Sequence, residues 1–422
     1  MRGQPQHSRY LDVGRFSRCL ARVAATVGVV VIGACGRPQS PAHVAAVSQQ
    51  ITPLKSDAEI RDLDIQYFMA RAQRDPSGAM DLAHLGALHL ARGRETGDPR
   101  DAILAEQAAR RSLHNRAVAN IGASQVLESA LLVQHRFAEA ITLAVAARDQ
   151  DPENPNLRAA VGDIQMELGQ YDSARASFAN LHTASGDLGV GPRMARWAEI
   201  EGQPDKARRI LHAVLVNAQK TNGVPREQMG WYWLRVGDVE MRAGHHREAD
   251  SAYKAGLNAH PDDYRLLSAL ARNAALQKHW KAAIGYGEQV IGLTLDPATL
   301  GTLSDAYAAI GDTAKSEEYA HVLDVAVLKQ PGAYHRAWSL FLLDHDRHVP
   351  TVARKIREEL RTRKDVYAYD LLAWSLHKQG NDLEAQKAMT LARREGTKDA
   401  QLSQHASAIQ QALGKARGTA SE

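Results

Sequence analysis

The chain has 422 residues and a formal net charge of +4. Its basic excess lies at the N-terminus: residues 1–34 hold five arginines and one aspartate, and the remaining residues hold 47 basic and 47 acidic side chains. A protein that binds nucleic acid needs a basic surface that displaces counterions. The balanced remainder therefore gives no global support for that class, and we expect no nucleic acid partner.

The N-terminal segment has the pattern of a secretory signal. Arg15, Arg18 and Arg22 precede the apolar run 23–32. This run is much shorter than the roughly 20 residues that span a bilayer. A basic region followed by a short apolar run is typical of an export signal. We therefore expect residues 1–34 to be a leader.

The leader ends in Ile32-Gly33-Ala34-Cys35. This motif resembles the lipobox of bacterial lipoproteins, in which small residues precede a cysteine that becomes N-terminal. The resemblance implies cleavage between Ala34 and Cys35, acylation of Cys35 with palmitate among the acyl chains, and a lipid anchor on the periplasmic side of the cell membrane or outer membrane. In that family, a residue such as Arg37 two positions on goes with outer-membrane sorting. Two alternatives stay open: an uncleaved anchor, and a cytosolic protein whose leader is wrongly assigned.

A tether and a helix are predicted next along the chain. Residues 35–56 are polar and contain Pro38, Pro41 and Pro53, a composition typical of a flexible linker. The other cysteine, Cys19, lies within the leader, so a processed chain would contain no disulfide. In residues 57–78, apolar side chains recur at helical spacing, and we expect a helix there.

A short motif recurs along the rest of the chain. A glycine or lysine is followed five positions later by an alanine within an apolar helical pattern. The first residues of the motif are separated by 33, 42, 34 and 102 residues, the last being three times 34. A period near 34 predicts a helical repeat solenoid, and the abundant alanine favours helices. The motif occurs at Gly169–Ala174, Gly202–Ala207, Gly244–Ala249, Lys278–Ala283 and Gly380–Ala385.

The repeating segment resembles tetratricopeptide repeats (TPRs). The clearest unit is 155–187, where Gly162 and Ala174 match the small residues at helix contacts and Tyr171 matches the bulky residue that fills the turn. The resemblance implies an all-α fold, a right-handed α-solenoid of stacked antiparallel helix pairs. We expect about eight to nine repeats over 79–398, followed by a capping helix and a disordered tail over 399–422.

Two insertions interrupt the period. Residues 94–99 lengthen the first unit, and we expect them to extend the turn between its helices. Residues 219–225 form a second long connection, which accounts for the 42-residue step. Insertions in repeat proteins usually lie in loops and often on the binding face.

Sequence motifs of catalysis are absent: the chain has no Walker A, GxSxG, CxxC or HExxH pattern. We therefore expect a non-catalytic protein without a cofactor or bound metal. One cluster, Asp344-His345-Asp346-Arg347-His348, alternates carboxylate and imidazole and could bind a divalent ion weakly. A metal-binding or enzymatic protein that uses this turn therefore stays open beside a plain polar turn.

The TPR resemblance also implies a concave groove lined by the first helix of each repeat. In the aromatic run 231–233, Trp233 falls at a packing position, and Trp231 is expected to point into the groove. The mixed charges suit recognition of a peptide with a few aromatic contacts, although many of these side chains could simply be solvated. The candidate groove residues are Asp163, Met166, Glu167, Trp231, Asp238, Arg242, Arg265, Arg272, Tyr367, Asp370, Trp374 and Lys378.

The sequence therefore predicts a lipid-anchored TPR scaffold of the bacterial cell envelope that binds a protein or peptide partner. A fold of this kind serves many unrelated processes, so the partner itself is not predicted.

Overall fold

A computed structural model of the chain describes residues 56–329 and 336–419. Every regular element in these ranges is a helix, twenty α-helices and one short 3-10 helix at His182–Ala184. This confirms the predicted all-α class. The predicted leader and acylated Cys35 lie outside the described residues. In the described ranges, no helix combines the length and apolarity needed to cross a membrane.

Helix α1 (Asp57–Arg74) precedes nine antiparallel helix pairs, and α20 (Ala400–Thr419) follows them. We number the pairs as repeats 1 to 9 and call their first and second helices A and B. The pairs are α2 (Ala79–Thr96) and α3 (Arg100–Asn115); α4 (Ile121–Val133) and α5 (Phe137–Gln150); α6 (Pro155–Glu167) and α7 (Tyr171–Phe178); α8 (Val190–Ile200) and α9 (Pro204–Lys220); α10 (Arg226–Arg242) and α11 (His246–Ala259); α12 (Tyr264–Leu276) and α13 (Trp280–Leu293); α14 (Pro297–Ala309) and α15 (Thr313–Lys329); α16 (Arg336–Asp344) and α17 (Val349–Glu359); α18 (Val366–His377) and α19 (Asp382–Ala392).

A residue with positive φ ends helix A in repeats 2 to 9. This left-handed conformation stops a helix and turns the chain back. Glycine adopts it without a Cβ penalty, which explains why glycine recurs in the motif. The interval between these residues is 33 to 35 positions, except for 42 between Gly202 and Gly244. They are His135, Gly169, Gly202, Gly244, Lys278, Gly311, Asp346 and Gly380.

Small residues let the two helices of a repeat touch. A Cβ built on Gly162 would lie 2.8 Å from Cε2 of Phe178, a side chain of helix B in the same repeat. Ala174 is fully buried. Both observations agree with the packing positions expected for this unit. A larger side chain at Gly162 would push the helices apart.

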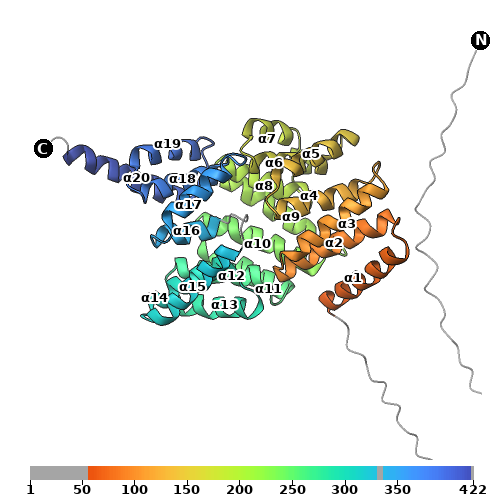
Figure 1. The fold of residues 1–422 in the computed structure, drawn as a ribbon, viewed down its shortest axis with the longest axis horizontal. Helices are drawn as coiled ribbons and strands as arrows, with labels where there is room; N and C mark the ends of the chain where they lie inside the picture. The colour runs from red at the N-terminus through yellow and green to blue at the C-terminus, as the bar shows by residue number, and fades with distance from the viewer. Residues whose placement is uncertain (1–55, 330–335, 420–422) are drawn as a thin grey trace, which may run out of the picture. The chain divides into compact units, whose positions relative to one another are not determined.

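Loops that are six repeats apart lie against each other. The turn of repeat 3 packs on the loop before repeat 9, where the backbone N–H of Lys364 donates to the carbonyl of Leu168 at 3.3 Å. In the same place, the backbone N–H of Val366 donates to the Tyr171 hydroxyl at 2.7 Å. Figure 1 shows the blue C-terminal helices α17 and α18 beside the yellow-green helices α6 and α8.

The next repeat makes the equivalent contact. The turn of repeat 4 packs on the loop before α20, where the Thr397 hydroxyl donates to the carbonyl of Ile200 at 2.7 Å. At the start of the solenoid, a Cβ on Gly97 of repeat 1 would lie 3.3 Å from Oγ1 of Thr294, which ends repeat 6. The two sides of each contact are therefore six repeats apart, and the superhelix completes a turn in about six repeats.

We call these contacts the interturn seam: Gly97 with Thr294, Leu168 and Tyr171 with 364–366, and Ile200 with Thr397. The backbones approach so closely that a Cβ on Gly169 would collide with the carbonyl of Lys364. A Cβ on Gly202 would collide with the carbonyl of Gly396.

The helix expected within 57–78 ends at Arg74, because Pro76 disfavours helical geometry at the residue before it. Two other predicted features differ from the observed ones. The insertion after Gly93 extends helix α2 to Thr96 instead of forming a long loop. Helix α20 continues to Thr419, into the segment for which a disordered tail is predicted, because that segment is rich in helix formers.

Replacement of Gly202 by alanine is expected to weaken the seam. Gly380→Ala is a matched control, because Gly380 has a similar positive φ of 75° but nothing within 4 Å of a Cβ. The control should lose only the left-handed preference, about 1–2 kcal/mol. Gly202→Ala should lose about 1–3 kcal/mol more by overpacking. Urea denaturation followed by circular dichroism measures the difference; equal losses would contradict the seam.

Candidate functional site

The candidate groove residues of repeat 3 form ion pairs inside the protein. Asp163 accepts a hydrogen bond from Arg196 of repeat 4 at 3.1 Å, and Glu167 is paired with the same guanidinium. Glu167 also lies 3.1 Å from Arg363, which comes from the loop before repeat 9. Burial lowers the pKa of Arg196, but the nearby carboxylates of Glu167 and Asp163 raise it by more. The pKa of Arg196 therefore lies above its usual value. These carboxylates are thus committed to internal partners.

The candidates of repeat 5 belong to a second network centred on Glu199. Its carboxylate pairs with Arg242 and lies 3.2 Å from Arg235. Asp238 lies 3.4 Å from Arg272 of the following repeat, and it also lies 3.3 Å from Arg235. Of these side chains, Arg272 is the most exposed, at 49%. The inner surface of repeats 4 to 6 is therefore held by alternating charges.

Arg265 makes a third network at the start of helix α12. It donates to Asp263 at 2.6 Å and to Glu227 at 2.8 Å. Burial opposes ionisation of Asp263, but hydrogen bonds from Arg265 and His260 hold its pKa below the usual range. Arg94 of repeat 1 reaches Glu227 at 3.4 Å. The insertion in the first repeat thus contributes a residue to the inner surface.

Some candidates are structural. Met166 is buried in the core, 2% exposed, and does not line a groove. Asp370 is fully buried, and its carboxylate accepts a hydrogen bond from His405 at 2.8 Å. Trp374 stacks on His405 with ring centroids 4.2 Å apart, and its indole N–H donates to Asp344 at 2.7 Å. The predicted groove position of Asp370 is wrong because α20 covers this side of α18.

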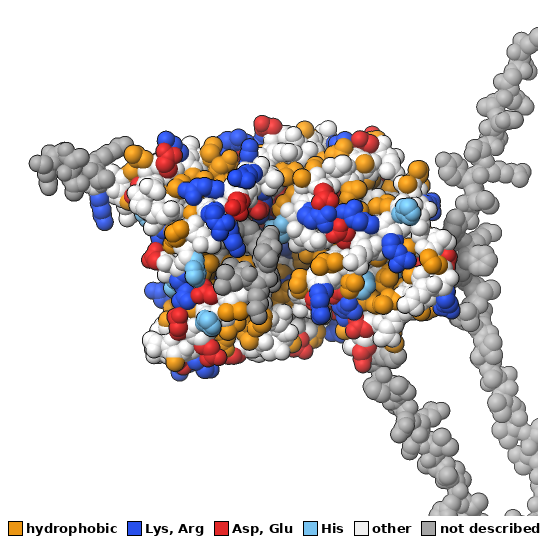
Figure 2. Space-filling model, in the orientation of Figure 1, with side chains coloured by type: hydrophobic (Ala, Val, Ile, Leu, Met, Phe, Trp, Pro, Cys, Tyr) orange, Lys and Arg blue, Asp and Glu red, His pale blue; other side chains and the backbone are white. Residues whose placement is uncertain are grey.

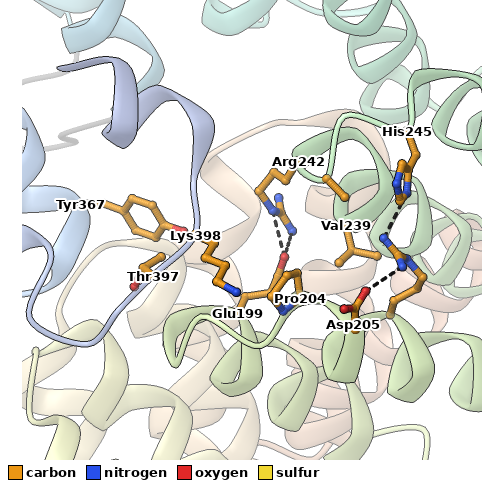
Figure 3. A pocket seen from close by; sticks show the side chains of 11 residues that line it. Glu199, Pro204, Asp205, Val239, Arg242, His245, Tyr367, Thr397 and Lys398 are labelled. Atoms are coloured by element: carbon orange, nitrogen blue, oxygen red, sulfur yellow. Dashed lines mark hydrogen bonds and ion pairs between the residues drawn. The ribbon is translucent and has the colours of Figure 1, made fainter. Parts of the chain in front are cut away.

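A cavity of about 330 Å³ lies where repeats 4 and 5 meet repeat 9 and the loop before α20. Figure 3 shows Glu199 and Arg242 on one side and Tyr367 and Lys398 on the other. Burial raises the pKa of Tyr367. Lys378, a further candidate directly after α18, does not line this cavity. Its ammonium group lies 2.9 Å from the carboxylate of Asp346.

Trp231 lines a second cavity, of about 370 Å³, on the inner surface. Its walls come from four repeats: Arg94 of repeat 1, Asp163 of repeat 3, Arg193 of repeat 4, and Glu227 beside Trp231 in repeat 5. Among the residues that the structure describes, none accepts a hydrogen bond from the Trp231 indole N–H. The ring of Trp231 packs against that of Tyr232, with ring centroids 5.3 Å apart. We call this space the Trp231 cavity.

Trp233 packs against the core as expected, but the more deeply buried aromatic residue of the run is Tyr232. Tyr232 is the buried member of the run, 1% exposed, and its hydroxyl donates to the carbonyl of Leu188 at 3.0 Å. Trp233 is half-buried and packs against the edge of the core. Trp231 is half-buried as well, and it is the one that lines a cavity.

Sequence analysis missed a buried carboxylate near this cavity. Glu128, on helix α4, is 4% exposed, and no hydrogen bond or salt bridge reaches it from the described part of the chain. Burial raises its pKa to about 7, with Arg193 opposing and Asp163 adding to the shift. Both of these residues line the Trp231 cavity. Glu128 thus sits in their electrostatic field.

The side chains of the Asp344–His348 turn bind different partners and do not converge on one point. His345 lies 2.8 Å from Asp305, Arg347 lies 2.7 Å from Asp324, and Asp346 pairs with Lys378. Within residues 56–329 and 336–419 there is no group of three histidine, cysteine or carboxylate side chains placed to hold a metal ion. The alternative of a metal site at this turn therefore has no geometric support in the described ranges.

One signal in the sequence could have identified the charge networks. Opposite charges recur one repeat apart, at equivalent positions of helix A. The separations are 33 residues for Asp163 and Arg196, and 34 for both Asp238–Arg272 and Arg336–Asp370. The face of the molecule drawn in Figure 2 shows no single-sign field either, because acidic and basic side chains are interspersed on it.

The fold and the inner surface define an α-solenoid of antiparallel helix pairs. A tetratricopeptide repeat family model matches residues 131–181, which run from the end of α4 through α7. This match supports the TPR character of repeats 2 and 3. No curated protein sequence matches the chain.

Several solved structures are similar to this chain at low identity. PilW, described as a widely conserved type IV pilus biogenesis factor, is 18% identical over 51% of this chain and 96% of its own, with a TM-score of 0.42. The APC/C hetero-tetramer Cut9–Hcn1 is 12% identical over 83% and 72%, with a TM-score of 0.42. The human IFIT1 dimer with PPP-AAAA is 15% identical over 81% and 95%, with a TM-score of 0.43.

Glu128→Gln is expected to change how stability depends on pH. The folded state keeps the Glu128 proton up to about pH 7, whereas the unfolded chain releases it near pH 4.5. The folded state therefore binds more protons between these values, and this group makes stability fall as pH rises through that window. The loss above pH 7 is about 3 kcal/mol.

The glutamine variant should escape this loss, so it should be more stable than the native chain at pH 8 and no more stable at pH 4. Urea denaturation at the two pH values measures this. The exposed Glu153→Gln serves as the control and should track the native chain. If Glu128→Gln is no more stable than the native chain at pH 8, ionisation of the buried carboxylate does not destabilise the folded state.

Proposed function

We propose that this protein is a non-catalytic scaffold that binds a segment of a protein or peptide partner on its inner surface. The observation that carries the proposal is the Trp231 cavity. There Trp231 lines open space, and its indole N–H has no hydrogen-bond partner among the described residues, whereas the charged candidates are paired within the chain.

The chemistry of the cavity suits a peptide. Arg193 and Arg94 are basic, Asp163 and Glu227 are acidic, and Gln228 has both a donor and an acceptor. A peptide offers backbone donors and acceptors together with side chains of either charge. Tryptophan is enriched among residues that dominate binding energy, because its large ring loses little conformational entropy when it is fixed. Trp231 would supply the apolar anchor and the indole N–H.

The second part of the proposal is a lipid anchor in the bacterial cell envelope. It rests on the basic and apolar leader and on the motif that ends at Cys35. Several acyl chains hold a protein to a membrane far more firmly than one chain does. A tether of about twenty residues would let the solenoid sample partners near the membrane surface.

Replacement of Trp231 is expected to abolish partner capture. Crosslinked pull-down from envelope fractions should recover a partner with the native chain and lose it, by about tenfold or more, with Trp231→Ala. Trp231→Phe keeps the ring but loses the N–H donor, so it should retain part of the capture. Leu383→Ala, on the outer helix α19, is the control and should behave as the native chain. Equal recovery with Trp231→Ala would place the binding surface elsewhere.

Palmitate labelling tests the anchor. Cells that express the native chain should incorporate radioactive palmitate into it, and Cys35→Ala should remove the label. The chain has only two cysteines, so Cys19→Ala is a matched control and should keep the label. Absence of label from the native chain would favour a cytosolic protein with a wrongly assigned leader.

A further inference from the structure

Helix α1 presents two apolar faces. One face packs on α2, where Ile65 and Phe68 contact the core of the first repeat. The other face carries Ile60, Leu63 and Tyr67, which are 48%, 43% and 52% exposed. The terminal helix of a solenoid normally has a polar outer face, because nothing stacks on it. An apolar stripe there indicates a partner.

The shape of the stripe indicates that the partner is a helix. Positions 60, 63, 67 and 70 repeat with the three-four spacing of a coiled-coil seam, which is narrower than the face a helix buries in a globular core. A lipid surface would need a wider apolar face flanked by basic residues. Acidic residues lie beside the first half of this stripe instead, and basic residues flank only its last turn; the acidic ones include Asp57, Glu59, Asp62 and Asp64.

The charges along α1 indicate which helix pairs with the stripe. The first turn is acidic, with Asp57 and Glu59, and the last turn is basic, with Arg71 and Arg74. A second copy of α1 in antiparallel orientation places its basic end beside the acidic end of the first copy. Opposite charges across such a seam set partner choice and orientation.

We infer that the protein forms a twofold-symmetric homodimer through antiparallel pairing of α1 with α1 of a second copy. In an antiparallel seam centred near position 65, Leu63 lies opposite Tyr67 and Ile60 lies opposite Ala70. Glu59 then lies opposite Arg71, and Arg74 lies beside Asp57. Each contact occurs twice, because the two copies use the same surface. The inference does not depend on peptide binding or on the lipid anchor.

The first test is sedimentation of the full-length chain in mild detergent. The native chain should sediment as a dimer, and Leu63→Lys should raise the dissociation constant at least tenfold. The control is Leu383→Lys, which places the same charge on an exposed leucine of α19, 69% exposed, and should leave the dimer intact. Circular dichroism should show native helix content in both variants, because both leucines are at the surface.

The second test is a charge swap. Asp57→Lys and Arg74→Glu should each weaken the dimer, since each places like charges together. The two changes in one chain should restore it, because the exchanged ends again complement each other. Arg71 is unsuitable for this test, since it is held by Asp81 of α2 at 2.8 Å.

Three results would overturn the inference. The native chain could sediment as a monomer at tens of micromolar, which would mean that another segment or another protein covers the stripe. The dimer could survive Leu63→Lys unchanged, which would place its interface elsewhere. The double charge swap could fail to restore a dimer that the single changes weaken, which would contradict antiparallel pairing.

Discussion

The interturn seam is the constraint on which the rest of the structure depends. It requires backbone to approach backbone where Gly169 meets Lys364 and where Gly202 meets Gly396. Both glycines also hold the left-handed conformation that ends helix A. One residue type thus meets two demands, because the absence of a Cβ permits the positive φ and leaves room for the opposing carbonyl. The conformational demand recurs in every repeat, whereas the steric demand applies only along the seam.

The seam also determines what the inner surface can do. It brings Arg363 of the loop before repeat 9 onto Glu167 of repeat 3, and Tyr367 next to the Glu199 and Arg242 pair. A buried charge is costly unless it is paired, and the inner surface meets this condition with carboxylates and guanidiniums one repeat apart. What stays available for a ligand is therefore a set of cavities, and in one of them, among the described residues, the Trp231 indole N–H has no internal hydrogen-bond partner.

Much of the fold could be predicted because its causes are local. The intervals near 34 residues, the alanine at the helix contact and the glycine at the turn are each determined within a single helix pair, and Gly162, Tyr171 and Ala174 were assigned correctly from one unit.

The site could be predicted only in part. Asp163 and Glu167 do lie on the inner surface, but Arg363, a partner of Glu167, is about two hundred residues away, and no local pattern indicates it. Asp370 was assigned to the groove because its position in helix A is standard, and α20, which covers it, lies outside the repeat. Glu128 was missed because a glutamate in a helix gives no sign of its burial.

The six-repeat register has a consequence for how this protein is built and how it unfolds. In an open array each unit contacts only its neighbours, so modules can be gained or lost freely and ends can fray independently. Here Tyr171 and Val366, 195 positions apart, share a hydrogen bond, and Thr397 and Ile200 are 197 apart. Insertion or deletion of a module between two such partners would misalign the bonds that span it. Modules that are six repeats apart are therefore coupled directly through these bonds, as well as through the modules between them.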